Sequence, residues 1–338
     1  MFLITGLLIL ILIIISIGAS QLWINNIKDK KSTTEFYIDK MVSLEQIAHQ
    51  LDTLQIIKSK VSFLTSCKLL RFTDQRVKLG RYVFKNGMNN FQIVSKLKSG
   101  IQDPVKVTLN NVRNIQELVG KLDVYLQLDS SAMIQKLTDS LYVDSLGYNV
   151  SNILTLFIPN TYEMYWTISF DKLIQRFKLE HYNFWKKGNR LELAKIKNLD
   201  EKQAYIVASI VEKETIVEAE KSTIAGVYLN RIRTGMKLQA DPTVVFAMGL
   251  LGIQRILYEH LTTISPFNTY MVEGLPPGPI CMPSLSSLDA VLNAEEHEYI
   301  FFCAKPGYDG SHAFAKTYFG HAQNAKIYRS WLDKERIR

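Results

Sequence analysis

The first 24 residues constrain the fold most strongly, because the run from Phe2 to Ile24 contains no charged residue. A run of this length can cross a lipid bilayer as a helix. The alternative is a cleaved signal peptide, which needs a basic start and a small-residue cleavage site. The basic start is absent, and the segment IGAS at 17–20 fits such a site poorly. We therefore expect residues 1–24 to form a retained transmembrane anchor.

The charges beside this anchor give a prediction for its orientation. Lys28, Lys30 and Lys31 follow the apolar run. Positive residues next to a span tend to remain in the cytoplasm, which would keep the rest of the chain inside the cell. The motifs described below indicate the opposite orientation, so the local charge pattern conflicts with them.

Amino-acid composition limits the classes of partner that the chain is expected to bind. The net charge is +8, from 40 Lys and Arg against 32 Asp and Glu, and it is spread along the chain. A basic exterior suits an anionic polymer, an anionic membrane or nucleic acid. Because no Cys/His finger or aromatic-basic run occurs, we expect no nucleic-acid partner. Cys67, Cys281 and Cys303 are odd in number and far apart, so they predict neither a disulfide framework nor a metal site.

One pattern recurs three times after the apolar run: an extended stretch, a turn and a short amphipathic helix. It occupies residues 35–51, 81–97 and 105–122. The unequal spacing argues against a solenoid and favours small α+β modules that pack together. Unrelated strand–helix pairs that look alike by chance are the alternative.

Residues 124–200 have a helical pattern with polar interruptions. Within them, Pro159 and Asn160 break an aromatic run, which predicts a loop that presents Tyr162, Tyr165 and Trp166. Aromatic faces can stack on sugar rings, but large aromatic residues also fill cores. For Tyr162 both roles remain open.

Local signals become denser after residue 202. We expect a helix that runs through Glu214, a second helix at 222–233 stopped by Gly235, and a third at 241–249 with Asp241 as its N-cap before a proline. Residues 265–284 are rich in proline and glycine, which predicts a rigid, shaped loop. An extended run and a terminal helix follow.

The first of these helices carries two glutamates, Glu212 and Glu214, within an apolar segment. Helical spacing places Glu214 on the same face as the aliphatic residues Val207, Ile210, Val211 and Val217. Glu212 falls nearly opposite, where we expect it to be solvated. Burial among aliphatic residues should raise the pKa of Glu214 above about 4.3. Such a carboxyl group can donate a proton to a glycosidic oxygen, or it can be a structural glutamate paired with Arg231 or Arg233.

Four strings then follow one another in fixed order: ASIVEKET at 208–215, VYLNRIRTGMKLQADPTVVFAMG at 227–249, SPFNTY at 265–270 and GLPPGPI at 274–280. Together they are highly specific, and the chain resembles the endolytic murein transglycosylases of the YceG-like (MltG) family over nearly its whole length. The resemblance implies an α+β fold with three parts. These are a transmembrane helix at 1–24, a small LysM-like α+β region at 33–123 and a mixed α+β catalytic domain with a helical lead-in at 124–338.

The resemblance also implies a function in cell-wall biogenesis. Members of the family are lyases that cleave the β-1,4 bond between N-acetylmuramic acid and N-acetylglucosamine in nascent peptidoglycan, leaving 1,6-anhydro ends. The catalytic glutamate of the family corresponds to Glu214, which would act first as general acid and then as general base, without metal or cofactor. The implied location is the outer side of the cytoplasmic membrane, with glycan strands, the membrane and peptidoglycan synthases as partners.

Further site residues are implied by matching motifs. Gln239, Asn268 and Tyr270 are candidate sugar contacts, as is Tyr162, although each could instead hold a loop in place. Asp241 is a second candidate carboxylate; if it flanks the site, a muramidase-type hydrolase becomes possible. A non-enzymatic glycan-binding scaffold is the remaining alternative. The sequence departs from the family at Asn160, where aspartate is common, but Glu214 is unaffected.

Overall fold

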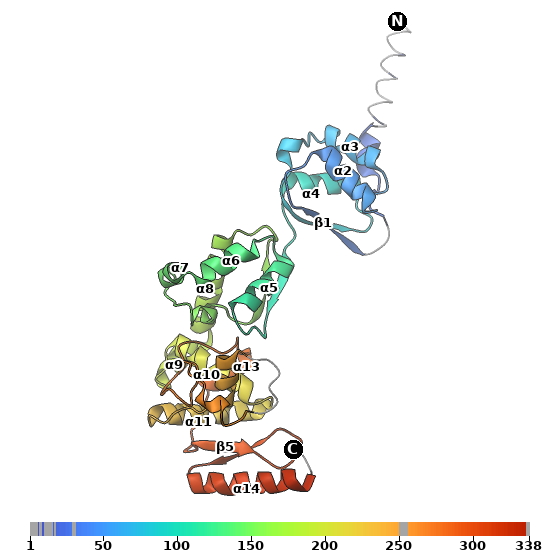
Figure 1. Cartoon of the computed structure of the whole chain (residues 1–338). Helices are drawn as coiled ribbons and strands as arrows, with labels where there is room; N and C mark the ends of the chain where they lie inside the picture. The colour runs from blue at the N-terminus through green and yellow to red at the C-terminus, as the bar shows by residue number, and fades with distance from the viewer. Residues whose placement is uncertain are drawn as a thin grey trace. The chain divides into compact units, whose positions relative to one another are not determined.

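The computed structural model describes residues 6, 9, 16, 18–28, 32–249 and 256–335, which form two compact units (Figure 1). One unit comprises Met1–Val107, Tyr125–Leu128 and Glu163–Ser169, and the other comprises Thr108–Val124, Asp129–Tyr162 and Phe170–Arg338. Most of the predicted anchor at 1–24 lies outside the described residues, so the anchor stays a prediction. No helix that the described residues form combines the length and the apolar character needed to cross a membrane.

The first unit is built on a two-stranded antiparallel sheet. Its strands are β1 (Thr33–Ile38) and β2 (Gly80–Lys85), with Phe36 paired to Tyr82. Alternation along β1 buries Phe36 and Ile38. The helices of the unit cover this apolar face and complete one core. They are α2 (Leu44–Thr53), α3 (Lys60–Leu69), the short 3₁₀ turn η1 (Asp74–Arg76) and α4 (Asn90–Ser99).

The strands of the three sequence repeats do not behave alike. Those of the first two repeats pair with each other as β1 and β2, whereas that of the third, β3 (Val105–Leu109), pairs with β4 (Asn160–Met164). The predicted loop around Tyr162 is therefore wrong, because this segment is a strand with Tyr162 and Met164 turned inward. Pro159 precedes the strand, where a missing N–H is tolerated. The LysM-like character of residues 33–123 stays a prediction.

Beyond β3 the chain is mainly helical. In order it forms α5 (Ile115–Tyr125), α6 (Ser130–Thr138), α7 (Ser140–Ser145), η2 (Ile153–Leu156), β4, α8 (Phe170–Lys186), η3 (Lys187–Asn189), α9 (Arg190–Ile196), α10 (Glu201–Glu214), η4 (Glu218–Glu220), α11 (Lys221–Arg233), α12 (Asp241–Met248), η5 (His260–Thr262), α13 (Leu285–Leu292), β5 (Phe301–Ala304), β6 (His312–Ala315) and α14 (Tyr318–Glu335). Strands β5 and β6 pair antiparallel, and α14 packs on them.

Helix α10 is the central element of the second unit. Its N-cap is Asp200, whose side chain accepts a hydrogen bond from the Gln203 N–H, while the Gln203 side chain accepts one from the Asp200 N–H. Every residue from Ala204 to Val211 is buried, because α9, α11, α12 and α13 all pack against the helix (Figure 1). The expectation of one apolar and one solvated face is therefore wrong for α10.

Candidate active site

Glu214 is the last residue of α10 and lies partly buried where α10 meets α11. Its Oε1 accepts a 2.5 Å hydrogen bond from the hydroxyl of Tyr228 on α11. Tyr228 is only 1% exposed, and its ring meets Phe302 edge-on at 6.0 Å. The tyrosine therefore fixes one carboxyl oxygen of Glu214 and leaves Oε2 for other partners.

The surroundings of Glu214 favour its protonated form. Burial raises the pKa of Glu214 to about 7, the Tyr228 hydrogen bond opposes this rise, the charge of Asp241 adds to it and the charge of Arg231 lowers it. Near neutral pH the carboxyl group is thus protonated in a large fraction of molecules. Burial, together with Glu214, raises the pKa of Tyr228 well above its ordinary value, so Tyr228 remains a donor. The acidic proton is then carried by Oε2.

The alternative of a structural ion pair at Glu214 is not realised. The guanidinium group of Arg231 donates instead to the carbonyl oxygens of Ile300 (2.7 Å) and Leu238 (2.5 Å). Arg233 donates to the side chain of Asn230. Among the described residues, no cation lies within ion-pair distance of the Glu214 carboxylate. Its charge is therefore free to change during a reaction.

Asp241 and Tyr270 form a second polar pair, in which the Tyr270 hydroxyl donates to Asp241 Oδ1 at 2.5 Å. Asp241 is exposed and is the first residue of α12. The predicted N-cap role of Asp241 is wrong, because Ala240 occupies that position and no side chain caps the helix. The carboxylate of Asp241 acts on the pKa of Glu214, and Glu214 acts on that of Tyr270. Asp241 and Tyr270 are therefore hydrogen-bonded to each other and lie within electrostatic range of Glu214.

Two buried threonines hold the loop that carries Tyr270. Thr269 Oγ1 accepts from the N–H of Ala240 at 3.0 Å and lies 2.9 Å from Thr243 Oγ1. The Gln239 N–H donates to the carbonyl oxygen of Thr269. Gln239 itself is exposed and has a left-handed backbone, with φ of 48°. The loop predicted at residues 265–284 is therefore held by hydrogen bonds to the residues around the start of α12.

The other two candidates from the sequence have structural partners. Asn268 is fully buried and donates to the carbonyl oxygens of Leu261 and Thr263 while accepting from the Tyr270 N–H, so it shapes the loop. Tyr162 is 3% exposed, and its hydroxyl donates to the carbonyl oxygen of Ile158. The geometry thus gives Asn268 a positioning role and places Tyr162 in the core.

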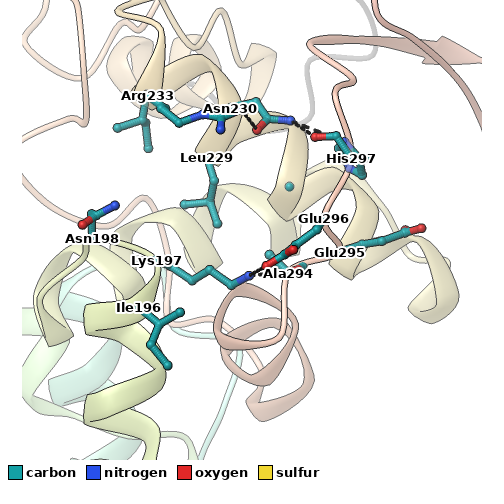
Figure 2. A pocket seen from close by; sticks show the side chains of 12 residues that line it. Ile196, Lys197, Asn198, Leu229, Asn230, Arg233, Ala294, Glu295, Glu296 and His297 are labelled. Carbon is teal, nitrogen blue, oxygen red and sulfur yellow. Dashed lines mark hydrogen bonds and ion pairs between the residues drawn. The ribbon is translucent and has the colours of Figure 1, made fainter.

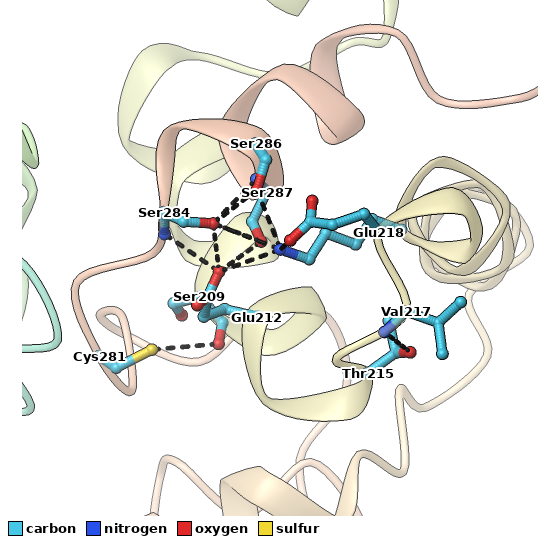
Figure 3. A network of polar contacts seen from close by, with 10 residues as sticks. Ser209, Glu212, Thr215, Val217, Glu218, Cys281, Ser284, Ser286 and Ser287 are labelled. Atoms are coloured by element: carbon cyan, nitrogen blue, oxygen red, sulfur yellow. Dashed lines mark hydrogen bonds and ion pairs between the residues drawn. The ribbon is translucent and has the colours of Figure 1, made fainter. Parts of the chain in front are cut away.

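Glu212 is not the solvated residue that helical spacing predicts. Its Oε2 accepts from the Ser284 N–H (3.0 Å), the Ser284 hydroxyl (2.5 Å) and the Ser287 hydroxyl (2.5 Å), and lies 3.7 Å from Lys221 Nζ (Figure 3). The start of α13 covers this turn of α10, which explains the difference. Burial raises the pKa of Glu212, but these hydrogen bonds and Lys221 outweigh it and hold the pKa below its usual value. Glu212 therefore anchors the turn that ends in Glu214.

Tyr228 is the site residue that the sequence did not single out. The available signal was weak: it lies three positions before Arg231 in a predicted helix, so both share one face. Many buried tyrosines satisfy the same pattern, and only the structure shows that this hydroxyl reaches Glu214.

Comparisons with known proteins match most of this chain to one family of proteins. The model of the YceG-like family matches residues 36–327. A Bacillus subtilis protein named endolytic murein transglycosylase is 27% identical over 318 residues, covering 90% of this chain and 87% of that protein. A Streptococcus pneumoniae protein of the same name is 26% identical over 294 residues, covering 78% of this chain and 52% of the relative. The crystal structure of a yceG-like protein from Listeria monocytogenes superposes with a TM-score of 0.56 at 25% identity, covering 87% of this chain and 99% of the other.

Proposed function

The chain belongs to the YceG-like family, and we propose that it is an endolytic murein transglycosylase whose proton donor is Glu214. The observation that carries this proposal is the state of that carboxyl group. It is partly buried, has a pKa of about 7, is bonded by Tyr228 on one oxygen and has no ion-pair partner among the described residues. A group with these properties can both give and take a proton at neutral pH.

The proposed reaction proceeds in two proton transfers. Glu214 first donates its proton from Oε2 to the oxygen that links N-acetylmuramic acid to N-acetylglucosamine, and the bond from C1 to that oxygen breaks. The 6-hydroxyl oxygen of the muramic sugar then bonds to C1, while its proton passes to the Glu214 carboxylate. A 1,6-anhydro end results, Glu214 is protonated again, and no water is consumed.

This route needs only one carboxyl group, since the attacking oxygen belongs to the substrate. A hydrolase on the same scaffold is the second candidate, because the charge of Asp241 reaches Glu214 and a second carboxylate could orient a water molecule. One oxygen of Asp241 already accepts the Tyr270 hydroxyl. We therefore assign Asp241 to tuning the pKa of Glu214.

We extend the proposal to location and glycan binding. The uncharged run from Phe2 to Ile24 supports a single-pass anchor in the cytoplasmic membrane, with the catalytic unit on the outer side where murein is assembled. For glycan binding by the first unit, support comes from Tyr37, which is 41% exposed on β1 and meets Trp166 edge-on at 5.0 Å. Aromatic faces of this kind stack on sugar rings.

Product analysis tests the proposal. The full chain in detergent is incubated with uncross-linked glycan strands, and the products are analysed by mass spectrometry. We expect anhydro-ended fragments, which Glu214→Gln abolishes and the exposed control Glu45→Gln does not. Fragments heavier by one water would indicate the hydrolase, and undiminished cleavage by Glu214→Gln would contradict both candidates.

A further inference from the structure

Helix α11 has a second face that borders a pocket, opposite the face that carries Tyr228. Residues three or four positions apart share a helix face, so Gly226, Leu229 and Arg233 lie on the side away from Tyr228 and Arg231. That opposite face borders a pocket of about 400 Å³, together with the end of α9 and residues 294–297 (Figure 2). This volume lies within the range of small-ligand sites, about 300 to 1,000 Å³.

We propose that this pocket binds the free carboxylate end of an uncross-linked murein stem peptide. The inference rests on the proposed function, because it identifies which form of murein the enzyme prefers. The chemical class required is a short peptide that ends in small apolar residues and an α-carboxylate, as nascent stem peptides do.

Arg233 is the group that would recognise the carboxylate. Its Nη2 donates to Asn230 Oδ1 at 3.0 Å. The Asn230 amide is in turn fixed, because its Nδ2 donates to the carbonyl oxygen of His297 at 2.7 Å (Figure 2) and to that of Tyr299 at 3.0 Å. The other guanidinium N–H groups of Arg233 have no acceptor within the described part of the chain. A guanidinium group held in this way is suited to a carboxylate.

The acidic residues of the pocket wall are already engaged. Glu295 accepts a 2.6 Å hydrogen bond from the Thr223 hydroxyl. Glu296 lies 3.6 Å from Lys197 Nζ, which also donates to the carbonyl oxygen of Ala294 at 3.1 Å. Lys197 therefore balances the charge of Glu296 but not that of Glu295. Arg233 forms no ion pair within the described residues, although its charge acts on Glu298, and it is the cation that could meet a ligand carboxylate.

The rest of the lining suits the end of a peptide. Ile196 is 69% exposed, and Leu229 and Ile232 add partly buried apolar surface. These three residues can pack against alanine methyl groups. The exposed Asn198 amide can bond to a peptide group. Cross-linking releases the terminal residue of a donor stem and joins the carbonyl of the preceding residue to an amine of a neighbouring stem as an amide. A cross-linked donor stem therefore has no free carboxylate, so a carboxylate pocket would favour nascent strands.

Binding to a non-cleaving enzyme tests the inference. The full-length Glu214→Gln chain in detergent is titrated calorimetrically with diacetyl-Lys-D-Ala-D-Ala and with the same peptide as its C-terminal amide. We expect the amide to bind at least tenfold more weakly. We expect the same loss when Arg233→Ala or Arg233→Lys is added, whereas the exposed control Arg76→Ala leaves binding unchanged. Leu229→Trp, which fills the pocket without touching the charge, should also abolish binding.

Three outcomes would overturn the inference: no binding of the acid at millimolar concentration, equal binding of acid and amide, or equal binding by the Arg233 variants. The proposed function is judged separately, by cleavage of peptide-free glycan strands by the unmodified chain. Anhydro products without peptide binding would support the proposed enzymatic function and contradict the role of the pocket. Peptide binding without anhydro products would support the role of the pocket and contradict the proposed enzymatic function.

Discussion

The hydroxyl of Tyr228 on α11 donates a 2.5 Å hydrogen bond to Oε1 of Glu214 at the end of α10. This contact stabilises the carboxylate, while burial favours the neutral acid. The balance between the two sets the pKa of about 7 at which the proposed acid and base steps are both accessible.

Tyr228→Phe should move the alkaline limb of the activity profile to higher pH. Removing the hydrogen bond destabilises the carboxylate, so Glu214 keeps its proton further into the alkaline range. A hydrogen bond to a charged group suggests a shift of about one pH unit. The measurement is kcat/KM against pH on uncross-linked strands, with the exposed Tyr182→Phe as control. An unchanged limb would contradict the role of Tyr228.

Asp241→Asn should move the same limb in the opposite direction. The negative charge of Asp241 raises the pKa of Glu214, so its removal allows Glu214 to ionise at lower pH. We expect activity at pH 6 to be largely retained and activity at pH 8 to fall severalfold. If Asp241 were instead the base of a hydrolase, the variant would be inactive at every pH, which separates the two explanations.

Glu214→Gln should stabilise the fold at alkaline pH. The pKa of Glu214 is about 7 in the folded state, against an ordinary value of 4.5. Its contribution to stability is fully present below pH 4.5 and is lost as the pH rises through 7. The difference corresponds to at most about 3 kcal/mol. Urea unfolding at pH 8 should favour the variant over the unmodified chain, and the difference should vanish at pH 4.

Glu212→Gln should destabilise the chain, by about 2 kcal/mol. The glutamine weakens three hydrogen-bonded contacts to α13 and removes the charge that faces the buried Lys221. Because the pKa of Glu212 is lowered in the folded state, this stability is present at neutral pH and lost as the pH falls through that lowered pKa. Thermal unfolding at pH 7 and pH 4 measures both effects, and the 92%-exposed Glu296 supplies the control substitution.

Thr269→Val should loosen the loop that carries Tyr270. The buried N–H of Ala240 loses its acceptor, which costs about 1 to 3 kcal/mol. The Tyr270–Asp241 pair should then be held less firmly near Glu214, so that kcat/KM falls. The pKa of Glu214 should change as well, because the charge of Asp241 acts on it. Thr262→Val, on an exposed position, is the matched control. Wild-type stability in the Thr269 variant would refute the locking role.

Local signals in the sequence predicted those parts of the fold that depend on neighbouring residues. The helix at 222–233 is observed as α11 (Lys221–Arg233), and Gly249 closes α12 with a left-handed backbone. These features follow from short-range stop and capping preferences. The N-cap of α12 was displaced by one residue, which local preferences do not resolve.

Features that depend on distant residues could not be predicted in this way. Strand β4 forms because β3 pairs with it, and nothing near Tyr162 reveals that partner. Glu212 accepts a hydrogen bond from Ser284, which lies 72 positions later in the sequence. Periodicity selected Glu214, but the reason was incomplete, because α10 is buried on all sides from Ala204 to Val211 and not along one stripe.

The final turn of α10 holds two carboxyl groups whose titrations are shifted in opposite senses, downward at Glu212 and upward at Glu214. Lowering the pH therefore protonates Glu212 and weakens the contacts that hold this turn. Raising the pH removes the proton that Glu214 needs for the proposed reaction. We therefore expect activity to be limited at low pH by Glu212 and at high pH by Glu214, two positions further along the helix.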